Sequence, residues 1–429
     1  MLKYKNIIED SIIEHLSVTD KEEIPVIICG KDCLCDDLEK HVLEMGGRVK
    51  YILPLINAVA AYIPTVGVKS MAMKDITEKI YLDDHVHKLM DTAPITVGSD
   101  FANEYGLTGK NVSIAVLDTG VFPHEDLTTP HNRIIGFKDF IKQKEQSYDG
   151  DGHGTHVAGI AAGNGFSSRG KYMGIAPDAN IVSVKVLKDD GSGNISDVIA
   201  GIQWVINNRD KYNIKIITLS LGTKAKSRYK DDLLCQAVDA AVTFNITVTV
   251  AAGNSGPDPS TIASPAISPN VITVGACDDR KTVHLGDISI ADFSSAGPTQ
   301  DGFKKPDIVA PGVGINSLAN RSLEYKKLSG TSMAAPVVAG CAALLYEKNP
   351  QMTPLQIKEL IMSNATDLGL DPNKQGTGLL NIEKIINAMK KGPLESSPDS
   401  PYAGDDIIEP SSSMDMFLMV LLVLIILTL

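Results

Sequence analysis

The chain has 429 residues and a net charge of −12, and 43% of its residues are hydrophobic and 21% charged. This length exceeds one average domain, while the composition is that of a globular protein that can bury a sizeable core. The acidic balance excludes the usual nucleic-acid-binding class, whose surface is basic, so we expect no nucleic-acid partner. We expect one large domain with smaller pieces attached to it.

The first 90 residues predict a small α+β domain. Residues 1–20 predict an amphipathic helix, and strand-like runs then alternate with stretches of helical spacing. The order β-α-β-β-α-β suits a ferredoxin-like unit. The predicted elements are strand 24–29, a helix with apolar residues from 34 to 43, two strands within 48–63, helix 66–74 and strand 76–82.

From residue 111 onwards the pattern changes to short β-branched runs separated by helical patterns. Near-continuous apolar strands that alternate with helices predict an α/β fold in three layers (αβα), with a mainly parallel central sheet. Functional residues in such a sheet follow the carboxyl ends of the strands. The strand candidates are 112–117, 181–186, 214–219, 246–250 and 271–274, and helix candidates are 195–208 and 231–244.

Four polar side chains stand at predicted strand ends or helix starts. Asp118 ends the first strand of this region, His153 opens a helix among glycines, and Asn254 follows a later strand. Ser332 precedes an apolar helix and, taken alone, is more typical of a helix cap. A serine becomes a nucleophile only beside a base and an oriented carboxylate. The chain order Asp, His, Ser is one that such triads adopt.

These side chains lie in the segments LDTG, GHGTHVAG, AAGN and GTSMAAP, and with these segments the chain resembles the subtilisin-like serine peptidases (subtilases) over residues from about 95 to 391. The resemblance implies a serine endopeptidase that forms an acyl-enzyme with Ser332. His153 would be its general base, and Asp118 would orient the imidazole. Asn254 would donate to the oxyanion together with the Ser332 N–H. His156, the rival base on the same helix, has a packing role in the family.

The resemblance also implies two backbone segments that hold an extended peptide between them, and a primary specificity pocket. Main-chain hydrogen bonds would give affinity, and alternate side-chain pockets would give selectivity. Each glycine segment by itself is also typical of a plain turn. The two peptide-binding segments are Gly191, Ser192 and Gly193, and Ser220, Leu221 and Gly222, and the pocket residues are Ala251, Ala252 and Gly253.

By the same resemblance, residues 1–90 are a prodomain that assists folding and then inhibits the peptidase domain of residues 91–391. Its last segment, residues 85–92, would thread the active site as a product-like peptide, with autocleavage within residues 86–93. A large parallel sheet folds slowly without help because its contacts are non-local. We therefore expect a zymogen whose own prodomain is an intramolecular inhibitor.

Rival motifs and metal sites find little support. An aspartic protease site needs two Asp-Thr/Ser-Gly motifs, and the sequence contains only the one at Asp118. Residues 165–171 match the GxxxxGK pattern of a phosphate-binding loop, but Tyr172 stands where that loop needs Ser or Thr. A calcium loop starting at Asp149 would need Glu where Ile160 stands. Many subtilases bind calcium after the histidine helix with help from an aspartate like Asp126. Because the loop 163–171 has no acidic residue, the sequence does not support a structural calcium ion there, although such a site stays open. We name no metal ligands, and we expect that catalysis requires no cofactor.

The C-terminal end has a linker of Pro, Ser and acidic residues at 392–413 and an apolar tail at 414–429. As a helix, residues 417–429 would extend about 20 Å, short of a bilayer core of about 30 Å. The tail is interpreted either as a possible membrane contact or as a segment packed on protein. The six scattered cysteines and the missing secretory signal favour a cytoplasmic protein. Two functional alternatives stay open, a silent peptide-binding pseudo-peptidase and a membrane-placed processing protease with few substrates.

Overall fold

The computed structural model describes residues 7–9, 12, 23–31, 35–83, 101–102, 105–280 and 288–390, together with the backbone of residues 85–88. Residues Met1–Ile386 form one compact unit and Asn387–Leu429 a second. Of the second unit, the structure describes only residues 387–390. The predicted helix 1–20, most of the segment 85–93, the linker and the apolar tail lie largely or wholly outside the described residues.

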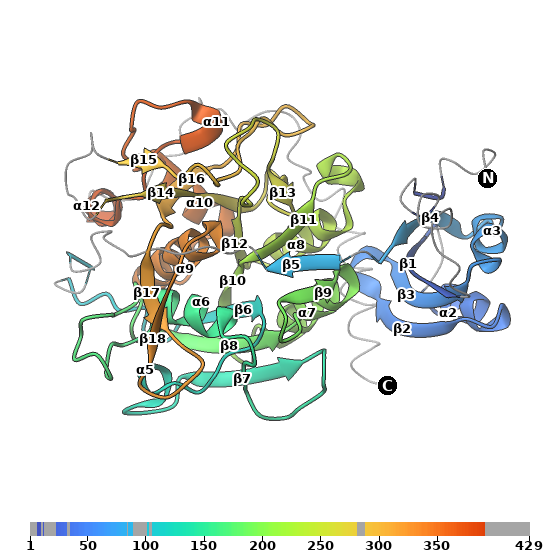
Figure 1. The fold of residues 1–429 in the computed structure, drawn as a ribbon, viewed down its shortest axis with the longest axis horizontal. Coiled ribbons are helices and arrows are strands. Elements are labelled where there is room, and N and C mark those ends of the chain that lie inside the picture. The colour runs from blue at the N-terminus through green and yellow to red at the C-terminus, as the bar shows by residue number, and fades with distance from the viewer. Residues whose placement is uncertain are drawn as a thin grey trace. The chain divides into compact units, whose positions relative to one another are not determined.

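The N-terminal sheet has the order β2-β3-β1-β4, and its paired strands are antiparallel (Figure 1, blue). This is the ferredoxin-like arrangement that the sequence predicts. We call this part, residues 7–83, the N-terminal domain. Its elements are β1 (Glu23–Gly30), α2 (Cys35–Glu44), β2 (Arg48–Leu53), η2 (Pro54–Ile56), β3 (Ala58–Pro64), α3 (Gly67–Ala72) and β4 (Thr77–Leu82).

Strand β1 is apolar on both faces, because two different cores cover it. Val26 and Ile28 pack in a cluster that includes Leu38 of α2. Ile27 and Cys29 belong instead to the core cluster of the large domain. Since successive strand residues point to opposite faces, the second face of this sheet is buried against the large domain. The N-terminal domain therefore shares a hydrophobic interface with the rest of the compact unit.

The central sheet has the order β15-β14-β12-β10-β6-β8-β7, and β16 pairs with β14. All of these pairs are parallel except β14 with β15. The predicted α/β fold with a mainly parallel sheet is therefore confirmed. The strands are β6 (Ser113–Asp118), β7 (Ile134–Asp139), β8 (Asn180–Lys185), β10 (Ile214–Leu219), β12 (Thr247–Ala251), β14 (Ile272–Asp278), β15 (Ser289–Ile290) and β16 (Ile308–Pro311).

Helices cover both faces of the central sheet. Ala115 and Leu117 of β6 pack in the cluster that includes α7 (Ile195–Asn208) and α8 (Leu233–Thr243). On the other face, α6 (His153–Ala162) and α9 (Thr331–Lys348) pack against the strands and against each other. The remaining helices are α5 (Glu125–Thr128), η3 (Tyr229–Asp231), α10 (Pro354–Ser363), α11 (Pro372–Gln375) and α12 (Ile382–Lys390).

Two smaller sheets lie beside the central one. β17 (Ile315–Leu318) and β18 (Tyr325–Leu328) form an antiparallel hairpin. A second sheet has the order β13-β11-β5-β9, made of β5 (His85–Lys88), β9 (Ser192–Asn194), β11 (Leu221–Lys224) and β13 (Ala263–Ser264). In this sheet the strand that follows the N-terminal domain lies between two strands of the large domain.

Three strands of the central sheet, β7, β15 and β16, are missing from the sequence prediction, and β15 has only two residues. β7 has an exposed residue in each half of its burial pattern and a glycine in its middle, so it lacks a continuous apolar run. A Cβ on Gly136 would lie only 3.1 Å from the Val182 side chain. Because the strands pack this closely here, a glycine fits better than a residue with a side chain. β16 has four residues and ends in Pro311. Short strands of this kind carry little periodicity of their own.

Candidate active site

The four polar side chains selected from the sequence stand at the ends of elements in the large domain. Asp118 is the last residue of β6, and Asn254 follows β12 by three residues. His153 is the first residue of α6, and Ser332 is the second residue of α9. The strand ends are carboxyl ends, which is where functional residues gather in parallel sheets.

His153 and Asp118 form a buried hydrogen-bonded pair. Nδ1 of His153 lies 2.7 Å from Oδ1 of Asp118, and both side chains are fully buried. Oδ1 also accepts the N–H of Thr119 at 2.7 Å, which fixes the carboxylate relative to the end of β6. A carboxylate can only accept here, so Nδ1 carries the proton. Nε2 has no hydrogen-bond partner among the described residues and is left as the basic nitrogen.

Asp149 holds the start of helix α6 in place. Its Oδ1 accepts the N–H groups of Asp151 at 3.0 Å and Gly152 at 2.8 Å, and its Oδ2 accepts the N–H and the hydroxyl of Thr155. These are the donors that a helix N-terminus leaves without partners in the helix. The sequence indicated Asp149 only as a weak calcium ligand, whereas its carboxylate orients the helix that carries His153.

Gly154 lets this helix approach strand β6. A Cβ at Gly154 would collide with the Gly120 carbonyl oxygen and would lie 3.0 Å from the Cβ of Asp118. Any larger residue would push α6 away from the strand end. The glycine after His153 is therefore needed so that the imidazole can reach Asp118.

Ser332 makes reciprocal contacts with Ser220. Its Oγ donates to the Ser220 carbonyl at 3.2 Å, while the Ser220 hydroxyl donates to the Ser332 carbonyl at 2.8 Å. Ser332 is fully buried, and Gly330 before the helix has a φ of 151°. The start of α9 thus presents the hydroxyl directly beside the first residue of the predicted segment 220–222.

Asn254 is held by Thr331, the residue before Ser332. Its Oδ1 accepts the Thr331 N–H at 3.0 Å and lies 3.0 Å from the Thr331 hydroxyl. A backbone N–H can only donate, so the atom facing it must be the amide oxygen, which fixes the orientation of the amide. The Nδ2 group is buried and has no partner among the described residues. It is therefore a donor that is still available.

His156 is placed differently from His153. Its Nε2 lies 3.0 Å from the carbonyl oxygens of both Ile315 and Lys326, so this nitrogen carries the proton and joins α6 to the β17–β18 hairpin. Complete burial lowers the pKa of His156 to about 3. A permanently neutral imidazole held by two carbonyls is a structural group, in line with the packing role expected for it.

The segments predicted to hold a peptide line both sides of β5. His85 is opposite Asn194 and Val86 opposite Gly193 in β9, while Lys88 is opposite Leu221 and His87 opposite Gly222 in β11. Both pairings are antiparallel. Gly191 and Ser192 precede or begin β9, with Gly191 at a φ of +81°. The backbone of residues 85–88 therefore lies where the sequence expected a substrate.

The three residues predicted to line the primary pocket follow one another at the end of β12. Ala251 and Ala252 are fully buried, and Gly253 has a φ of +112°. The Gly253 N–H donates to the Thr331 hydroxyl at 3.2 Å. These contacts join the end of β12 to the start of α9, and the contact of these residues with a substrate stays a prediction.

Asp126, weighed above as a calcium ligand, has protein donors on both oxygens. Oδ1 accepts the Ser167 N–H at 2.8 Å, and Oδ2 accepts the Tyr325 hydroxyl at 2.8 Å. Within the described ranges, no group of three or more His, Cys, Asp or Glu side chains is arranged to hold a metal ion. No residue set in this part of the chain can be assigned to a metal.

Comparison with known proteins shows what this chain is similar to. Residues 109–379 match the model of the subtilase family. The chain is 44% identical to serine protease AprX of Bacillus subtilis over 367 residues, which cover 80% of this chain and 82% of that protein. The chain belongs to the subtilase family. This subtilase is also 37% identical to subtilisin E of B. subtilis, covering 80% of this chain and 84% of that protein. Its identity to subtilisin BL of Lederbergia lenta is 42%, covering 66% and 93% of the respective chains.

Family membership establishes the general activity. This subtilase is a serine endopeptidase, a hydrolase that cleaves peptide bonds of polypeptides. In the part of the chain that the structure describes, no helix is both long enough and apolar enough to cross a membrane.

Proposed function

We propose that this endopeptidase works through a triad of Asp118, His153 and Ser332 and is made as an autoprocessed zymogen. The observation that carries the triad is the 2.7 Å hydrogen bond between His153 Nδ1 and Asp118 Oδ1, which leaves Nε2 as a base. The neighbouring buried histidine, His156, has both carbonyl partners on Nε2 and does not compete for this role.

In the proposed reaction, Ser332 Oγ attacks the scissile carbonyl carbon while its proton passes to His153 Nε2. Ser332 Oγ donates to the Ser220 carbonyl in the structure, so the hydroxyl turns from that oxygen to Nε2 as it reacts. Asp118 stabilises the imidazolium that forms. The C–N bond then breaks, the amine takes the proton from His153, and water hydrolyses the acyl-enzyme in the reverse sequence.

The oxyanion of the tetrahedral intermediate would accept from Asn254 Nδ2 and from the Ser332 N–H. The Asn254 amide is already oriented by two contacts with Thr331, so no reorganisation is needed when charge develops. Its Nδ2 has no partner among the described residues, which supports this role. No step needs a metal ion or cofactor.

The N-terminal domain would act as the inhibitory prodomain. The pairing of β5 with β9 and β11 supports a product-like occupation of the peptide-binding segments. Lys50 supports the docking: its Nζ lies 3.3 Å from Asp83 of the N-terminal domain and 3.2 Å from Asp197 of α7. Tyr51 adds a hydrogen bond of 2.9 Å to Asp197.

Two measurements test the proposal. A fluorophosphonate probe should label the wild type and not Ser332→Ala, because only an activated serine is phosphonylated. An unlabelled, well-folded wild type would instead favour the pseudo-peptidase. Purified Ser332→Ala should stay full length, while the wild type is cut within residues 86–93. Cutting of the purified variant at the same bond would contradict self-processing.

The location of the protein stays a prediction. The apolar tail lies outside the described residues, and a membrane contact through it would be tested by carbonate extraction of membranes with and without residues 414–429. Extraction of both forms alike would contradict a membrane-placed processing protease. The cysteines that the structure describes form no disulfide with one another, which supports a cytoplasmic protein.

A further inference from the structure

A buried lysine ends the apolar strand β8. Lys185 is the last residue of this strand, and its side chain is fully buried. It lies opposite Asp118 in the parallel pairing of β6 with β8. Residues that are opposite each other in neighbouring strands place their side chains on the same face of the sheet. The ammonium group of Lys185 therefore lies on the face that carries the Asp118 carboxylate.

The partners of Lys185 are a carbonyl oxygen and a carboxylate. Its Nζ donates to the Thr119 carbonyl at 2.6 Å and lies 2.8 Å from Oδ1 of Asp189. The other carboxylate oxygen of Asp189 lies 2.5 Å from Lys142 Nζ. The side chain of Asp189 is 33% exposed and that of Lys142 is 48% exposed. We call Lys142, Lys185 and Asp189 the lysine cluster, and it extends from the end of β6 to the surface.

Thr119 connects the lysine cluster to Asp118. Its N–H donates to Asp118 Oδ1 at 2.7 Å, and its hydroxyl accepts the Gly154 N–H at 3.0 Å. Because Lys185 holds the carbonyl of the same residue, the turn after β6 is fixed at three polar atoms. A Cβ on Gly120 would lie 3.5 Å from Cδ of Lys185, so the lysine stem runs beside this turn. An apolar residue in place of Lys185 would remove a charge-assisted hydrogen bond from the turn.

Asp189 connects the same cluster to the loop before His153. A Cβ on Gly150 would collide with the Asp189 carboxylate, which therefore packs directly against the backbone of this loop. The loop ends at His153, the first residue of α6. The lysine cluster thus contacts the segment that follows Asp118 and the segment that precedes His153.

The charge of Lys185 stands near a carboxylate that has an unused oxygen. Oδ2 of Asp118 is buried and has no hydrogen-bond partner among the described residues. A positive charge nearby favours the ionised form of such a group, and charges act over longer distances where water is excluded. The lysine cluster contains two cations and one anion. Removing Lys185 and removing the charge of Asp189 therefore change the local charge in opposite directions.

Two other titratable groups face the lysine cluster, and both are hydrogen-bonded elsewhere. The ring centroid of Tyr148 lies 5.1 Å from Lys185 Nζ, and its hydroxyl donates to Asp139 at 2.9 Å. Asp149, beside Gly150, accepts the backbone N–H groups at the start of α6. Neither group forms an ion pair with Lys185 among the described contacts, so Asp189 is the acid that directly offsets its charge.

We propose that Lys185 is a positioning residue for the Asp118–His153 pair. It holds the turn that orients Asp118 and supplies a buried positive charge on the same face of the sheet, and Asp189 partly neutralises that charge. The inference rests on the proposed function, because it takes Asp118 and His153 as members of the triad.

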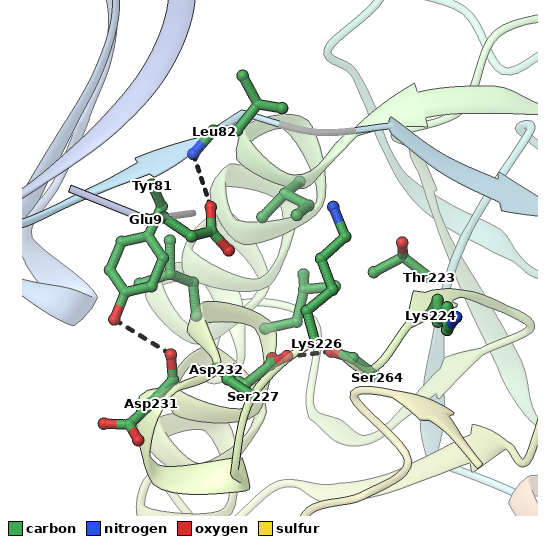
Figure 2. Close-up of a pocket in the computed structure, with 13 residues that line it drawn as sticks. Glu9, Tyr81, Leu82, Thr223, Lys224, Lys226, Ser227, Asp231, Asp232 and Ser264 are labelled. Carbon is green, nitrogen blue, oxygen red and sulfur yellow. Dashed lines mark hydrogen bonds between the residues drawn. The ribbon is translucent and has the colours of Figure 1, made fainter. Parts of the chain in front are cut away.

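The lysine cluster does not belong to the pocket beside β11. That pocket is lined by residues that include Thr223, Leu233 and Ser264, and no member of the lysine cluster lines it (Figure 2). Substitutions in the cluster should therefore change kcat more than KM.

The pH profile of kcat/KM for one peptide substrate tests this role. Lys185→Met should lower kcat about tenfold, because the pair loses its alignment. It should also move the midpoint of the acid limb up by about half a pH unit, since the loss of a nearby cation favours protonated imidazole. Asp189→Asn leaves the charge of Lys185 unopposed and should move the midpoint down. A role in folding alone would not produce shifts of opposite sign.

Lys358→Met is the matched control, because Lys358 is also a buried lysine that donates to carbonyls and pairs with an aspartate. Its Nζ donates to the Pro269 and Val271 carbonyls and lies 3.0 Å from Asp307 Oδ1. These partners lie at the amino end of β14, whereas Asp118 stands at the carboxyl end of β6. Lys358→Met should lower Tm, as Lys185→Met does, and leave the midpoint of the acid limb in place.

The outcomes separate the positioning role from the proposed function. Enzyme that takes up the fluorophosphonate and keeps the wild-type midpoint in Lys185→Met and Asp189→Asn would overturn the positioning role alone. Shifts of the same sign in these two variants, or an equal shift in Lys358→Met, would also overturn it. Failure of the probe to label Ser332 in the wild type would instead overturn the proposed function. Should Lys185→Met fold poorly, the direction of the shift in Asp189→Asn decides the question.

Discussion

The side-chain oxygen of Asn254 lies 3.0 Å from both the backbone nitrogen and the hydroxyl oxygen of Thr331. The two residues come from different elements, one from the segment after β12 and the other from the first turn of α9. Thr331 thereby fixes the orientation of the Asn254 amide and leaves Nδ2 without a partner among the described residues. The residue before the predicted nucleophile thus orients the predicted oxyanion donor.

We expect Asn254→Leu to lower kcat by about 10²–10³, the range known for the oxyanion asparagine of subtilisin, with a smaller change in KM. The Nδ2 donor contributes in the transition state, where the oxyanion forms. Thr331→Val, which keeps the N–H and removes the hydroxyl, should cost only about tenfold. Steady-state kinetics on one peptide substrate would show this, and an Asn254→Leu effect confined to KM would contradict it.

A second prediction concerns His156 and acid stability. Burial lowers its pKa from 6.5 to about 3, so between these values the unfolded chain binds a proton that the folded protein does not. The contribution of His156 is therefore fully present above about pH 6.5 and is lost as the pH falls, by about 1.4 kcal/mol per pH unit. Urea unfolding of Ser332→Ala at several pH values measures this slope. His156→Gln in the same background should reduce the slope, and an unchanged slope would argue against the assignment.

A third prediction concerns Asp307, which joins two buried lysines. Its Oδ2 lies 2.6 Å from Lys305 Nζ, and its Oδ1 lies 3.0 Å from Lys358 Nζ. Removing the shared carboxylate charge leaves two ammonium groups inside the protein. Asp307→Asn in Ser332→Ala should therefore lower the free energy of unfolding by about 3–5 kcal/mol.

The matched control for Asp307 is an exposed ion pair. Arg321 and Glu324 lie 4.0 Å apart, with 76% and 57% of their side chains exposed. Glu324→Gln should change the free energy of unfolding by less than about 1 kcal/mol. Equal effects of Asp307→Asn and Glu324→Gln on the free energy of unfolding would show that burial does not increase the contribution of the Asp307 ion pairs to stability.

A fourth prediction concerns metal removal. Both oxygens of Asp126 have protein donors, and the loop 163–171 has no acidic residue. We expect EDTA to leave peptidase activity and Tm within experimental scatter, since calcium needs several oxygen ligands, with carboxylates prominent among them. Activity lost in EDTA and recovered with CaCl2, but not with MgCl2, would reveal a calcium site that these residues do not indicate.

Much of the fold follows from local patterns. The runs 214–219 and 195–208 predict β10 and α7 at their observed bounds, because strand and helix periodicities are properties of neighbouring residues. The sequence did not predict strand β7, because a glycine and exposed residues interrupt its apolar run. What marks it as a strand is its pairing with β8, which is a contact between distant parts of the chain.

In the candidate site, too, local sequence patterns predicted some features and contacts between distant parts of the chain decided others. The motifs around Asp118, His153, Asn254 and Ser332 were sufficient to select these residues. The role of Asp149 at the start of α6 was not visible, because an aspartate among glycines is as typical of a calcium loop as of a helix cap. Its bonds to Gly152 and Thr155 show that its carboxylate holds the start of α6 in place.

The sequence by itself determined the family, the order of most elements and which side chains are the candidates for the chemistry, since these follow from residue identity and short-range spacing. The tertiary structure alone decided the protonation of His156 and the orientation of the Asn254 amide. His156 is neutral because Ile315 and Lys326, 159 and 170 residues away, supply its carbonyl partners and bury it. Asn254 keeps its Nδ2 group without a described partner because Thr331, 77 residues away, holds its oxygen. Protonation and orientation depend on solvent exclusion and on donors from remote segments, and these exist only once the chain is folded.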